Sequence, residues 1–371
     1  MDAVRTGVVG IGIMGSSHAK NLANDVEGSQ LTAVCDASRQ RLDWAKETFG
    51  DKVQLFDNYD AMLASGAIDA VVVASAHYDH PRQAIAAFKK GLHVMIEKPA
   101  GVDTASVREM NEAAAASGKV FSIMFNQRTV GVYGKLRELI NSGETGPITR
   151  IVWIITEWFR NEAYYKSGGW RATWAGEGGG VLINQCPHNL DLWQWICGMP
   201  KRIRGFCHFG KHHDIEVEDD VTAYMEYENG ATGVIITSTG DAPGTNRLEI
   251  TCDRGKLVLE DNKLIWRRTR TPVKEFTKTT SDMWAKNEVW DINIPSNSEG
   301  GPHVILLRNW INAIRKGEKL ISPGAEGING LSISNAIHLS SWTNDWADVP
   351  VDEKRFGELL KQKIATSRGR R

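Results

Sequence analysis

A carboxylate, an amine and a proline follow one another at Glu97-Lys98-Pro99, directly after an apolar run that reads as a short buried strand. In an open parallel α/β sheet, ligands bind beyond the carboxyl ends of the strands. Partial desolvation there lowers the pKa of a lysine, which suits Lys98 to handling the proton of a substrate hydroxyl. Pro99 restricts the backbone of Lys98 to extended conformations. Taken alone, these residues fit an ordinary solvated strand end equally well.

A glycine-rich turn, Gly10-Ile11-Gly12-Ile13-Met14-Gly15, lies between an apolar strand (Val4 to Val9) and a helix-like stretch from about Ser16 to Asn24. This is the strand, turn and helix context of a dinucleotide-binding motif, in which the glycines permit a tight turn, close approach of a pyrophosphate and close helix packing. The helix N-terminus offers free N–H groups to the phosphates. The cofactor-binding residues predicted from this turn are Gly10, Gly12, Ile13, Met14 and Gly15.

The next predicted strand, Leu31 to Cys35, ends in Asp36. An acid at this position hydrogen-bonds the adenosine ribose hydroxyls and repels a 2′-phosphate, so the sequence favours NAD over NADP. Arg39 and Arg41 follow closely enough to leave NADP open. We therefore add Asp36 and Arg41 to the predicted cofactor site.

A fourth predicted strand, Ala67 to Ala74, leads into polar residues beside the cofactor site. His77 and His80 could touch the nicotinamide ribose, although a helix cap and a solvated loop explain each of them equally well. Ser75, at the same carboxyl edge of the sheet, joins them in the predicted cofactor site. Glu97 and Lys98 complete the predicted cofactor-binding set.

Strands alternate with helices as far as residue 126 and then give way to a different pattern. The fold class predicted is therefore α/β, with a doubly wound Rossmann domain over residues 1–126. Residues 127–371 are predicted to form an α+β domain with an open, mostly antiparallel sheet, in which residues 228–230 make a hairpin turn. Helices cover one face of that sheet, and its other face is available for a second subunit.

The second domain contains a segment rich in aromatic and polar residues. Rings that stack on the C–H face of a sugar, beside groups that hydrogen-bond its hydroxyls, suit a polyhydroxylated ligand. The residues predicted to bind substrate there are Trp158, Arg160, Tyr165, Trp170, Trp174, Asn184 and His188, with Lys98 from the first domain. His188 follows a proline at a helix start and could serve as general base and acid, although a lone histidine there is more often a cap or a core partner.

The residues quoted above carry a resemblance to a known family. The Gly10, Gly12 and Gly15 motif, Glu97-Lys98-Pro99, and Gly178-Gly179-Gly180-x-Leu182 followed by His188-x-Leu190-Asp191 resemble the glucose–fructose oxidoreductase, inositol dehydrogenase and rhizopine catabolism (Gfo/Idh/MocA) family, over essentially the whole chain. The resemblance implies NAD(P)-linked oxidation or reduction of a secondary hydroxyl on a sugar, glycoside or cyclitol. It also implies a homodimer or homotetramer joined through the second domain's sheet.

In such enzymes the residues matching Lys98 and His188 handle the hydroxyl proton, and the lysine–proline bond is often cis. An aspartate four residues before the histidine commonly assists, and here Asn184 stands in its place. An amide can orient a hydroxyl but cannot accept its proton. The resemblance therefore assigns catalysis to Lys98, His188 and Asn184, with the acid–base role left to the first two.

Composition excludes several other classes of function. The net charge of −1 gives no electrostatic footprint for nucleic acid or for an anionic membrane, and no apolar run approaches the length of a membrane span. Five cysteines without a Cys-x-x-Cys pair, and no signal-like segment before the first strand, fit the cytoplasm. The histidines and acids between Cys207 and Glu216 match no metal-site spacing, so no metal is predicted.

The function predicted is an NAD(P)-dependent sugar or cyclitol dehydrogenase. Two alternatives remain, of which the first would use the same residues and the second is opposed by the presence of both Lys98 and His188. A lyase or glycosidase that retains NAD would oxidise its substrate only transiently, and a regulator with this fold would bind a sugar without catalysis.

Overall fold

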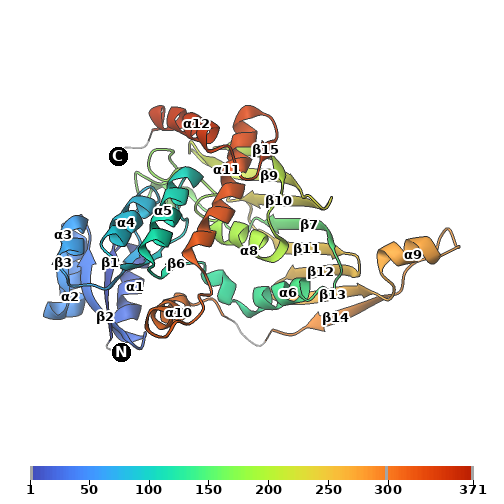
Figure 1. Cartoon of the computed structure of the whole chain (residues 1–371). Coiled ribbons are helices and arrows are strands. Elements are labelled where there is room, and N and C mark those ends of the chain that lie inside the picture. Colours follow the sequence, from blue (N-terminus) through green and yellow to red (C-terminus); the bar gives the residue numbers. More distant parts are fainter. Residues whose placement is uncertain (1–2, 297–299, 369–371) are drawn as a thin grey trace. The chain divides into compact units, whose positions relative to one another are not determined.

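The computed structural model describes residues 3–296 and 300–368, which divide into two compact units (Figure 1). The first unit comprises Met1–Thr129 and Gly301–Leu331, and the second comprises Val130–Gly300 and Ser332–Arg371. The sequence-based division at residue 126 differs from this arrangement, because it left residues 301–331 with the substrate half. That segment returns to the first unit.

The described part of the first unit is built on a six-stranded parallel sheet in the order β3-β2-β1-β4-β5-β6. Its strands are β1 (Val4–Val9), β2 (Ser29–Cys35), β3 (Gln54–Phe56), β4 (Ala70–Val73), β5 (His93–Ile96) and β6 (Phe121–Ile123). Its helices are α1 (Ile13–Asn24), α2 (Arg39–Phe49), α3 (Tyr59–Ala64), α4 (Asp79–Lys89), α5 (Thr104–Ser117) and α10 (His303–Lys316). The strand order reverses between β1 and β4, which is where doubly wound sheets bind ligands.

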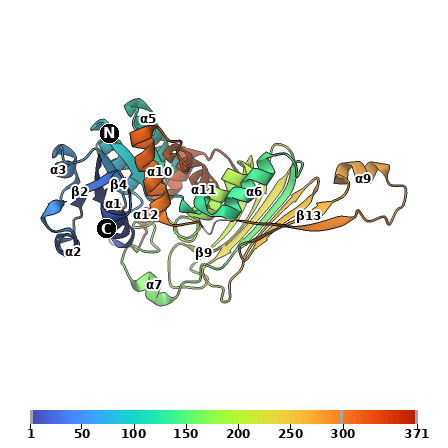
Figure 2. The same ribbon diagram turned by 90° about the horizontal axis from the view of Figure 1, so that it is seen from below.

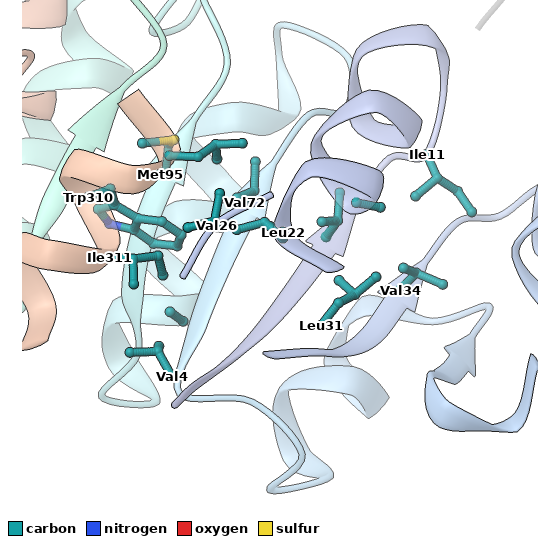
Figure 3. Packing of buried hydrophobic residues seen from close by; sticks show 14 of the residues in the cluster. Val4, Ile11, Leu22, Val26, Leu31, Val34, Val72, Met95, Trp310 and Ile311 are labelled. Atoms are coloured by element: carbon teal, nitrogen blue, oxygen red, sulfur yellow. The ribbon is translucent and has the colours of Figure 1, made fainter. Parts of the chain in front are cut away.

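Helix α10 joins the first unit because its apolar face completes that unit's core. Trp310 and Ile311 are fully buried in a cluster with Leu22 of α1, Val72 of β4 and Met95 of β5 (Figure 3). Burying a large apolar side chain contributes about 1.5–3 kcal/mol relative to leaving it exposed. The segment 301–331 is therefore part of the first unit's core, although most of the second unit precedes it in the sequence.

The described part of the second unit contains a nine-stranded sheet in the order β14-β13-β12-β11-β7-β10-β9-β8-β15. Its strands are β7 (Ile148–Ile155), β8 (Arg202–Phe209), β9 (Glu218–Glu226), β10 (Thr232–Ser238), β11 (Asn246–Cys252), β12 (Gly255–Glu260), β13 (Lys263–Thr269), β14 (Val289–Ile294) and β15 (Ala347–Asp348). Every neighbouring pair is antiparallel except β7 with β10. The helices here are α6 (Gly131–Asn141), α7 (Glu162–Lys166), α8 (Pro187–Cys197), α9 (Val273–Thr279), α11 (Gly327–Thr343, whose first residues belong to the first unit) and α12 (Glu353–Ala365).

The two faces of this sheet differ. Helix α6 lies along one face in Figure 2, and the side chains directed to the covered face, such as Trp153 and Met225, are buried. On the opposite face, Tyr224 and Ile265 belong to one row of paired residues that crosses from β9 through β10, β7, β11 and β12 to β13. Both side chains are more than a third exposed. The second unit therefore has one covered and one open sheet face.

The predicted fold class is confirmed: a parallel Rossmann-like sheet is followed by a mixed, mostly antiparallel one. The hairpin at residues 228–230 connects β9 and β10, as expected. The sequence analysis missed α2, α7, β13, α9, β14 and β15. Strands β13 and β14 form one edge of the nine-stranded sheet, and α9 lies in the connection between them, beyond the sheet in Figure 2. Within the described ranges, no helix is long and apolar enough to cross a membrane.

Candidate functional site

The glycine turn of the first unit has the geometry that its sequence predicts. Gly10 has a φ of +82°, and a Cβ there would lie 2.7 Å from the backbone of Ala74. A Cβ on Gly15 would lie 1.9 Å from the carbonyl oxygen of Gly10, so only glycine allows α1 to start this close to the turn. A Cβ on Gly12 would meet nothing within 4 Å. Gly12 therefore faces the open space where a ligand's phosphates would approach.

The N-terminus of α1 has hydrogen-bond donors to offer. Its N-cap, Gly12, has no side chain, so the first N–H groups of the helix receive no side-chain cap. Ile13 is 75% exposed and Met14 is half-buried beside it. Uncapped N–H groups and the positive end of the helix dipole form a site for a pyrophosphate. The local structure therefore fits a dinucleotide.

Asp36 connects the glycine turn to the segment between β2 and α2. Its carboxylate accepts the N–H of Ile11 at 2.9 Å and the N–H of Ser38 at 2.8 Å. The side chain also lines a cavity of about 430 Å³ at the carboxyl ends of β1, β2 and β4. The residues around this cavity are Val9, Gly10, Cys35, Asp36, Ala37, Asp57, Asn58, Tyr59, Asp60, Ser75, Asp79, Arg82 and Gln83. Its size and position suit an adenosine group.

The charges around the cavity disfavour the 2′-phosphate that distinguishes NADP from NAD. Four carboxylates, from Asp36, Asp57, Asp60 and Asp79, line it, and the guanidinium of Arg82 is paired with Asp79 at 2.8 Å. The arginines that left NADP open lie outside the lining, and Arg39 pairs instead with Asp43 on the exposed side of α2. Arg41 is also exposed on α2. The local electrostatics therefore favour NAD, and the structure does not support a cofactor contact by Arg41.

Of the three residues predicted after β4, Ser75 lines the cavity and donates a hydrogen bond to Gln83 at 2.7 Å. His77 is 9% exposed, with its ring 6.1 Å from that of His80. His80 is 1% exposed, and its ring nitrogens lie 2.8 Å from the Pro99 carbonyl and 3.1 Å from the Ser75 carbonyl. Burial lowers its pKa, so a neutral imidazole donates to one carbonyl at a time.

This geometry corrects the expectation for His80. Its side chain is closed off from a ribose because both ring nitrogens face backbone carbonyls. It connects the turn after β4 to the Lys98-Pro99 segment and therefore positions the backbone on both sides of the predicted nicotinamide site. The Lys98–Pro99 peptide bond is cis.

Glu97 also differs from the expectation of direct cofactor contact. It is 6% exposed, and its Oε1 lies 2.6 Å from His18 Nε2, while its Oε2 accepts the backbone N–H of Lys98 at 3.0 Å. Burial alone would raise the pKa of Glu97, but the hydrogen bond and charge of His18, with the charge of Lys98, lower it to about 2. An ionised Glu97 is therefore held beneath the half-buried Lys98.

The sequence analysis missed His18 and His303, which lie near Glu97. His18 belongs to α1 and is fully buried, and the ring of His303, on α10, lies 5.7 Å from its ring. Burial lowers the pKa of His303. The available signal was the position of His18, three residues after Gly15 and therefore on the inner side of α1. The helix that begins at the phosphate site is thus bonded to the residue that precedes Lys98.

In the second unit, a run of turns that carries Asn184 leads into α8, and His188 lies in the first turn of that helix. Both side chains are half-buried. The buried carboxylate of Glu218 accepts the N–H groups of Gly180 at 2.8 Å and Leu182 at 3.1 Å and so fixes the glycine segment before them. Pro187 stands in the first turn of α8, where its missing N–H costs no hydrogen bond. His188 is therefore presented from a rigid helix start.

Asn184 has a carboxylate partner that the sequence analysis did not identify. Its Nδ2 donates to Oε1 of Glu177, which is 3% exposed. The other Glu177 oxygen accepts the N–H of Ala172 at 2.6 Å. No regular spacing links residues 177 and 184, since glycine-rich turns separate them, and sequence periodicity gives no signal for such a pair.

Several predicted substrate residues gather around Tyr164. The guanidinium of Arg160 lies 5.0 Å from the Tyr164 ring and 5.8 Å from the Trp158 ring, and the Tyr165 ring lies 5.2 Å from that of Tyr164. Tyr165 donates to or accepts from Thr239 at 2.9 Å, and burial raises its pKa to about 12, so it stays a neutral phenol. Trp170 is 39% exposed. This group offers ring faces and polar atoms of the kind that bind sugars.

Trp174 does not belong to this group. It is 3% exposed, donates to the Glu216 carbonyl at 3.0 Å and packs against Trp342 with ring centroids 5.5 Å apart. Trp174 is therefore a core residue of the second unit, and its surroundings do not support the predicted substrate contact. An aromatic ring at this position is needed by the core, and composition alone does not distinguish the two uses.

The histidine-rich segment before β9 is a structural connection. His213 contacts buried Asp219 at 3.1 Å and the Arg160 carbonyl at 2.8 Å, and His212 lies 3.4 Å from Asp220. In the part of the chain that the structure describes, no group of three histidines, cysteines or acids could hold a metal ion. The segment supports the loop after β7 that carries Arg160.

The predicted site residues thus fall into two sets. The first unit brings together the glycine turn, Asp36, Ser75 and the Glu97-Lys98 pair. The second unit brings Asn184 and its partner Glu177 together. It also links the rings of Trp158 and Trp170 to that of Tyr164 through the guanidinium groups of Arg160 and Arg171.

Two family profiles match consecutive parts of the chain. The oxidoreductase family with an NAD-binding Rossmann fold matches residues 4–125, and the GFO/IDH/MocA C-terminal domain matches residues 133–258. Together they cover more than half of the chain.

Curated relatives include inositol dehydrogenases. The chain is 31% identical to inositol 2-dehydrogenase of Salmonella typhimurium over 144 residues, which are 38% of this chain and 43% of that enzyme. It is 25% identical to scyllo-inositol 2-dehydrogenase (NAD(+)) of Bacillus subtilis over 270 residues, 69% of this chain and 73% of that enzyme. The match to the Salmonella enzyme thus spans less than half of its length.

Solved structures with the same fold include the WlbA dehydrogenase of Bordetella pertussis in complex with NADH and UDP-GlcNAcA. Its TM-score is 0.79 at 24% identity, and the match covers 94% of this chain and 100% of that chain. Levoglucosan dehydrogenase in complex with NADH has a TM-score of 0.77 at 19% identity, with 94% and 100% covered. At these identities the likeness shows the fold.

Proposed function

The chain belongs to the Gfo/Idh/MocA family of oxidoreductases with an NAD-binding Rossmann domain, and we propose that it transfers a hydride between NAD and a secondary hydroxyl of a sugar, glycoside or cyclitol. The observation that carries this proposal is the position of Lys98. It follows β5 in the sheet that carries the glycine turn and the Asp36 cavity, and ionised Glu97 lies beneath it.

The residues divide the work of the proposed reaction. When bound, NAD supplies the hydride acceptor. The Lys98 ammonium stabilises the negative charge that develops on the hydroxyl oxygen, while the His188 imidazole accepts the hydroxyl proton. Asn184 orients the substrate through hydrogen bonds and does not take the proton. The glycine turn, Asp36 and Ser75 hold the cofactor.

The proposed substrate class follows from the second unit and from the relatives. Trp158, Arg160, Tyr165 and Trp170 combine ring faces with polar atoms, which suits a molecule bearing several hydroxyls. Similar proteins are named for inositols and for levoglucosan, an anhydrosugar. We extend the proposal to a homo-oligomer formed through the open sheet face, and to the cytoplasm because all five cysteines are free thiols.

Near-ultraviolet absorbance tests the activity. Purified protein with added NAD⁺ is offered a panel of monosaccharides, glycosides, anhydrosugars and inositols. We expect a steady rise with at least one compound, lost in Lys98→Ala and kept in Lys89→Ala, which removes an exposed lysine from α4. No rise with any compound would contradict the proposal. Nucleotide retained through purification would then favour a transient-oxidation lyase.

A further inference from the structure

Glu177 places a buried carboxylate beside the amide that stands where a family aspartate is common. Asn184 Nδ2 donates to Glu177 Oε1, and the side chain of Glu177 is 3% exposed. The charge that position 184 lacks is therefore present next to it, on a residue seven positions earlier in the chain.

This contact fixes which end of the Asn184 amide is the donor. An amide has a donor nitrogen and an acceptor oxygen, and a carboxylate accepts only. Because Nδ2 donates to Glu177, Oδ1 is the end of the Asn184 amide that acts as an acceptor. An aspartate at position 184 would also be an acceptor. The pair thus reproduces the hydrogen-bonding half of the aspartate's role.

The backbone around Glu177 is built to hold it in place. The N–H of Ala172 donates to Glu177 Oε2 at 2.6 Å, and Ala172 has a φ of +52°, which is unusual for a residue with a side chain. Arg171 Nη1 lies 4.0 Å from Glu177 Oε1. A Cβ on Gly176 would lie 2.4 Å from the Trp170 carbonyl, so the segment before Glu177 packs tightly. The carboxylate is ordered by several independent contacts.

We propose that Glu177 is a positioning residue for the acid–base site, and that the Glu177–Asn184 pair performs the task that a single aspartate performs in other members of the family. This inference rests on the proposed dehydrogenase function. It also explains the asparagine: because a buried carboxylate stands at position 177, the side chain at position 184, which contacts it, must be a hydrogen-bond donor.

Asn184→Asp is the substitution that this pairing affects most directly. That substitution restores the common family residue but sets two buried carboxylates in contact, and one of them must then retain a proton. In the folded state this raises a carboxyl pKa above its unfolded value. The stability that the shared proton provides is present in acid and is lost as the pH rises. Moving the charge, with Glu177→Gln and Asn184→Asp together, removes the conflict.

A double-mutant cycle over four proteins tests this: the wild type, Glu177→Gln, Asn184→Asp and the double variant. Thermal unfolding is measured from acid to neutral pH and needs no substrate. We expect Asn184→Asp to lose roughly 5 °C or more at neutral pH and to recover as the pH falls, and the double variant to regain most of the loss. Glu162→Gln, half exposed on α7, is the matched control and should behave as the wild type.

Turnover is measured on the same four proteins with the substrate that the panel identifies. We expect each single variant to lose about 10-fold or more in kcat, with NAD affinity unchanged, and the double variant to recover at least part of that loss. The pH profile of Asn184→Asp should gain an ionisation that the double variant lacks. A merely structural Glu177 would lower stability without this change in the profile.

The outcomes separate the two levels of the argument. Additive effects on stability, or a double variant no better than Asn184→Asp, would overturn the pairing. Coupled stability with unaltered kcat in Glu177→Gln would overturn the positioning role. A wild type that reduces NAD with no compound would instead contradict the proposed function, and the unfolding measurements would still decide whether the two side chains act as a pair.

Discussion

Glu97 carries a negative charge in the interior of the first unit, where an unpaired charge would be costly. The Nε2 of His18 and the backbone N–H of Lys98 are the groups that stabilise it. The same contacts link the cofactor-binding helix to the residue proposed to act on the substrate. The charge therefore has a structural use and a functional one.

Replacing Glu97 with glutamine tests the structural use. The pKa of Glu97 is lowered from 4.5 to about 2 in the folded chain, so its stabilisation is complete above pH 4.5 and is lost as the pH falls toward 2. We expect Glu97→Gln to be less stable than the wild type by roughly 3 kcal/mol near neutrality, with a gap that narrows in acid. Denaturant unfolding across this pH range measures it. Exposed Glu109→Gln is the control, and a gap independent of pH would contradict the account.

Asp36 gives a second test at this scale. It contributes one of four carboxylates around the proposed adenosine cavity. Asp36→Asn keeps an acceptor for the N–H of Ile11 and removes a charge that repels a 2′-phosphate. We expect the ratio of kcat/KM for NADP to that for NAD to rise about 10-fold, while Asp43→Asn on the exposed side of α2 leaves it unchanged. An unchanged ratio in Asp36→Asn would show that the cavity does not receive the ribose.

Residues were predictable where their role depends on neighbours in sequence. Gly10, Gly15 and Asp36 belong to one strand–turn–helix–strand unit, and their roles follow from its local geometry. His18 and Glu97 are 79 positions apart, and no local pattern announces their contact. Trp174 was assigned to the substrate because it lies in a polar, aromatic-rich segment. The sequence does not show whether such a ring packs in a core or binds a sugar.

The turn between β1 and α1 is the element on which cofactor binding depends. Its glycines are required for different physical reasons, and alanine substitutions at each position distinguish these reasons. Gly15→Ala places a Cβ 1.9 Å from the Gly10 carbonyl, so we expect loss of roughly 3 kcal/mol of stability. Gly12→Ala meets open space, so stability should stay within about 0.5 kcal/mol while NAD affinity falls.

Thermal unfolding and NAD titration are made on both variants. Gly134→Ala on α6, where a Cβ also meets nothing within 4 Å, controls for the substitution itself. Equal stability losses in Gly12→Ala and Gly15→Ala would contradict this reading of the turn. So would undiminished NAD affinity in Gly12→Ala.

Elements with a clear apolar pattern were predictable, and the first strand, β1, was found with the predicted bounds, Val4–Val9. Helix α2 was missed because its face toward the sheet buries only Leu42 and Ala45 among many charged residues. Helix α9 and strand β14 were missed because none of their residues is buried. Strand β13 was missed because its outward-facing Ile265 is as apolar as the buried Leu264 and Trp266 beside it, so the sequence does not alternate although the burial does. An element with few buried residues has little apolar patterning in its sequence and is therefore difficult to predict.

The division of the whole molecule could not be read from the sequence, because the first unit is discontinuous. Helix α10 has an apolar face that any core would accept, and only the folded chain shows that Trp310 packs with Val72 and Met95. The alternation of predicted strands and helices identifies where a domain begins, but it does not show whether a later segment of the chain packs into that domain.

The open sheet face leads to a prediction about assembly. Tyr224 and Ile265 stand in one row across this face, on β9 and β13, and both are more than a third exposed. If the face joins subunits, Tyr224→Glu with Ile265→Glu buries charge at the interface and should yield monomers. Light scattering after size exclusion measures the mass, with Arg108→Glu on α5 as the control. A wild-type monomer would contradict the proposed assembly.

In the proposed reaction, a hydride passes from a substrate carbon to NAD. The most direct measurement uses the substrate that the panel identifies, prepared with deuterium on its carbinol carbons, and follows the label by nuclear magnetic resonance. We expect deuterium at C4 of the nicotinamide in released NADH, and no transfer in Lys98→Ala with NAD still bound. Consumption of the substrate with no label in released NADH would contradict it.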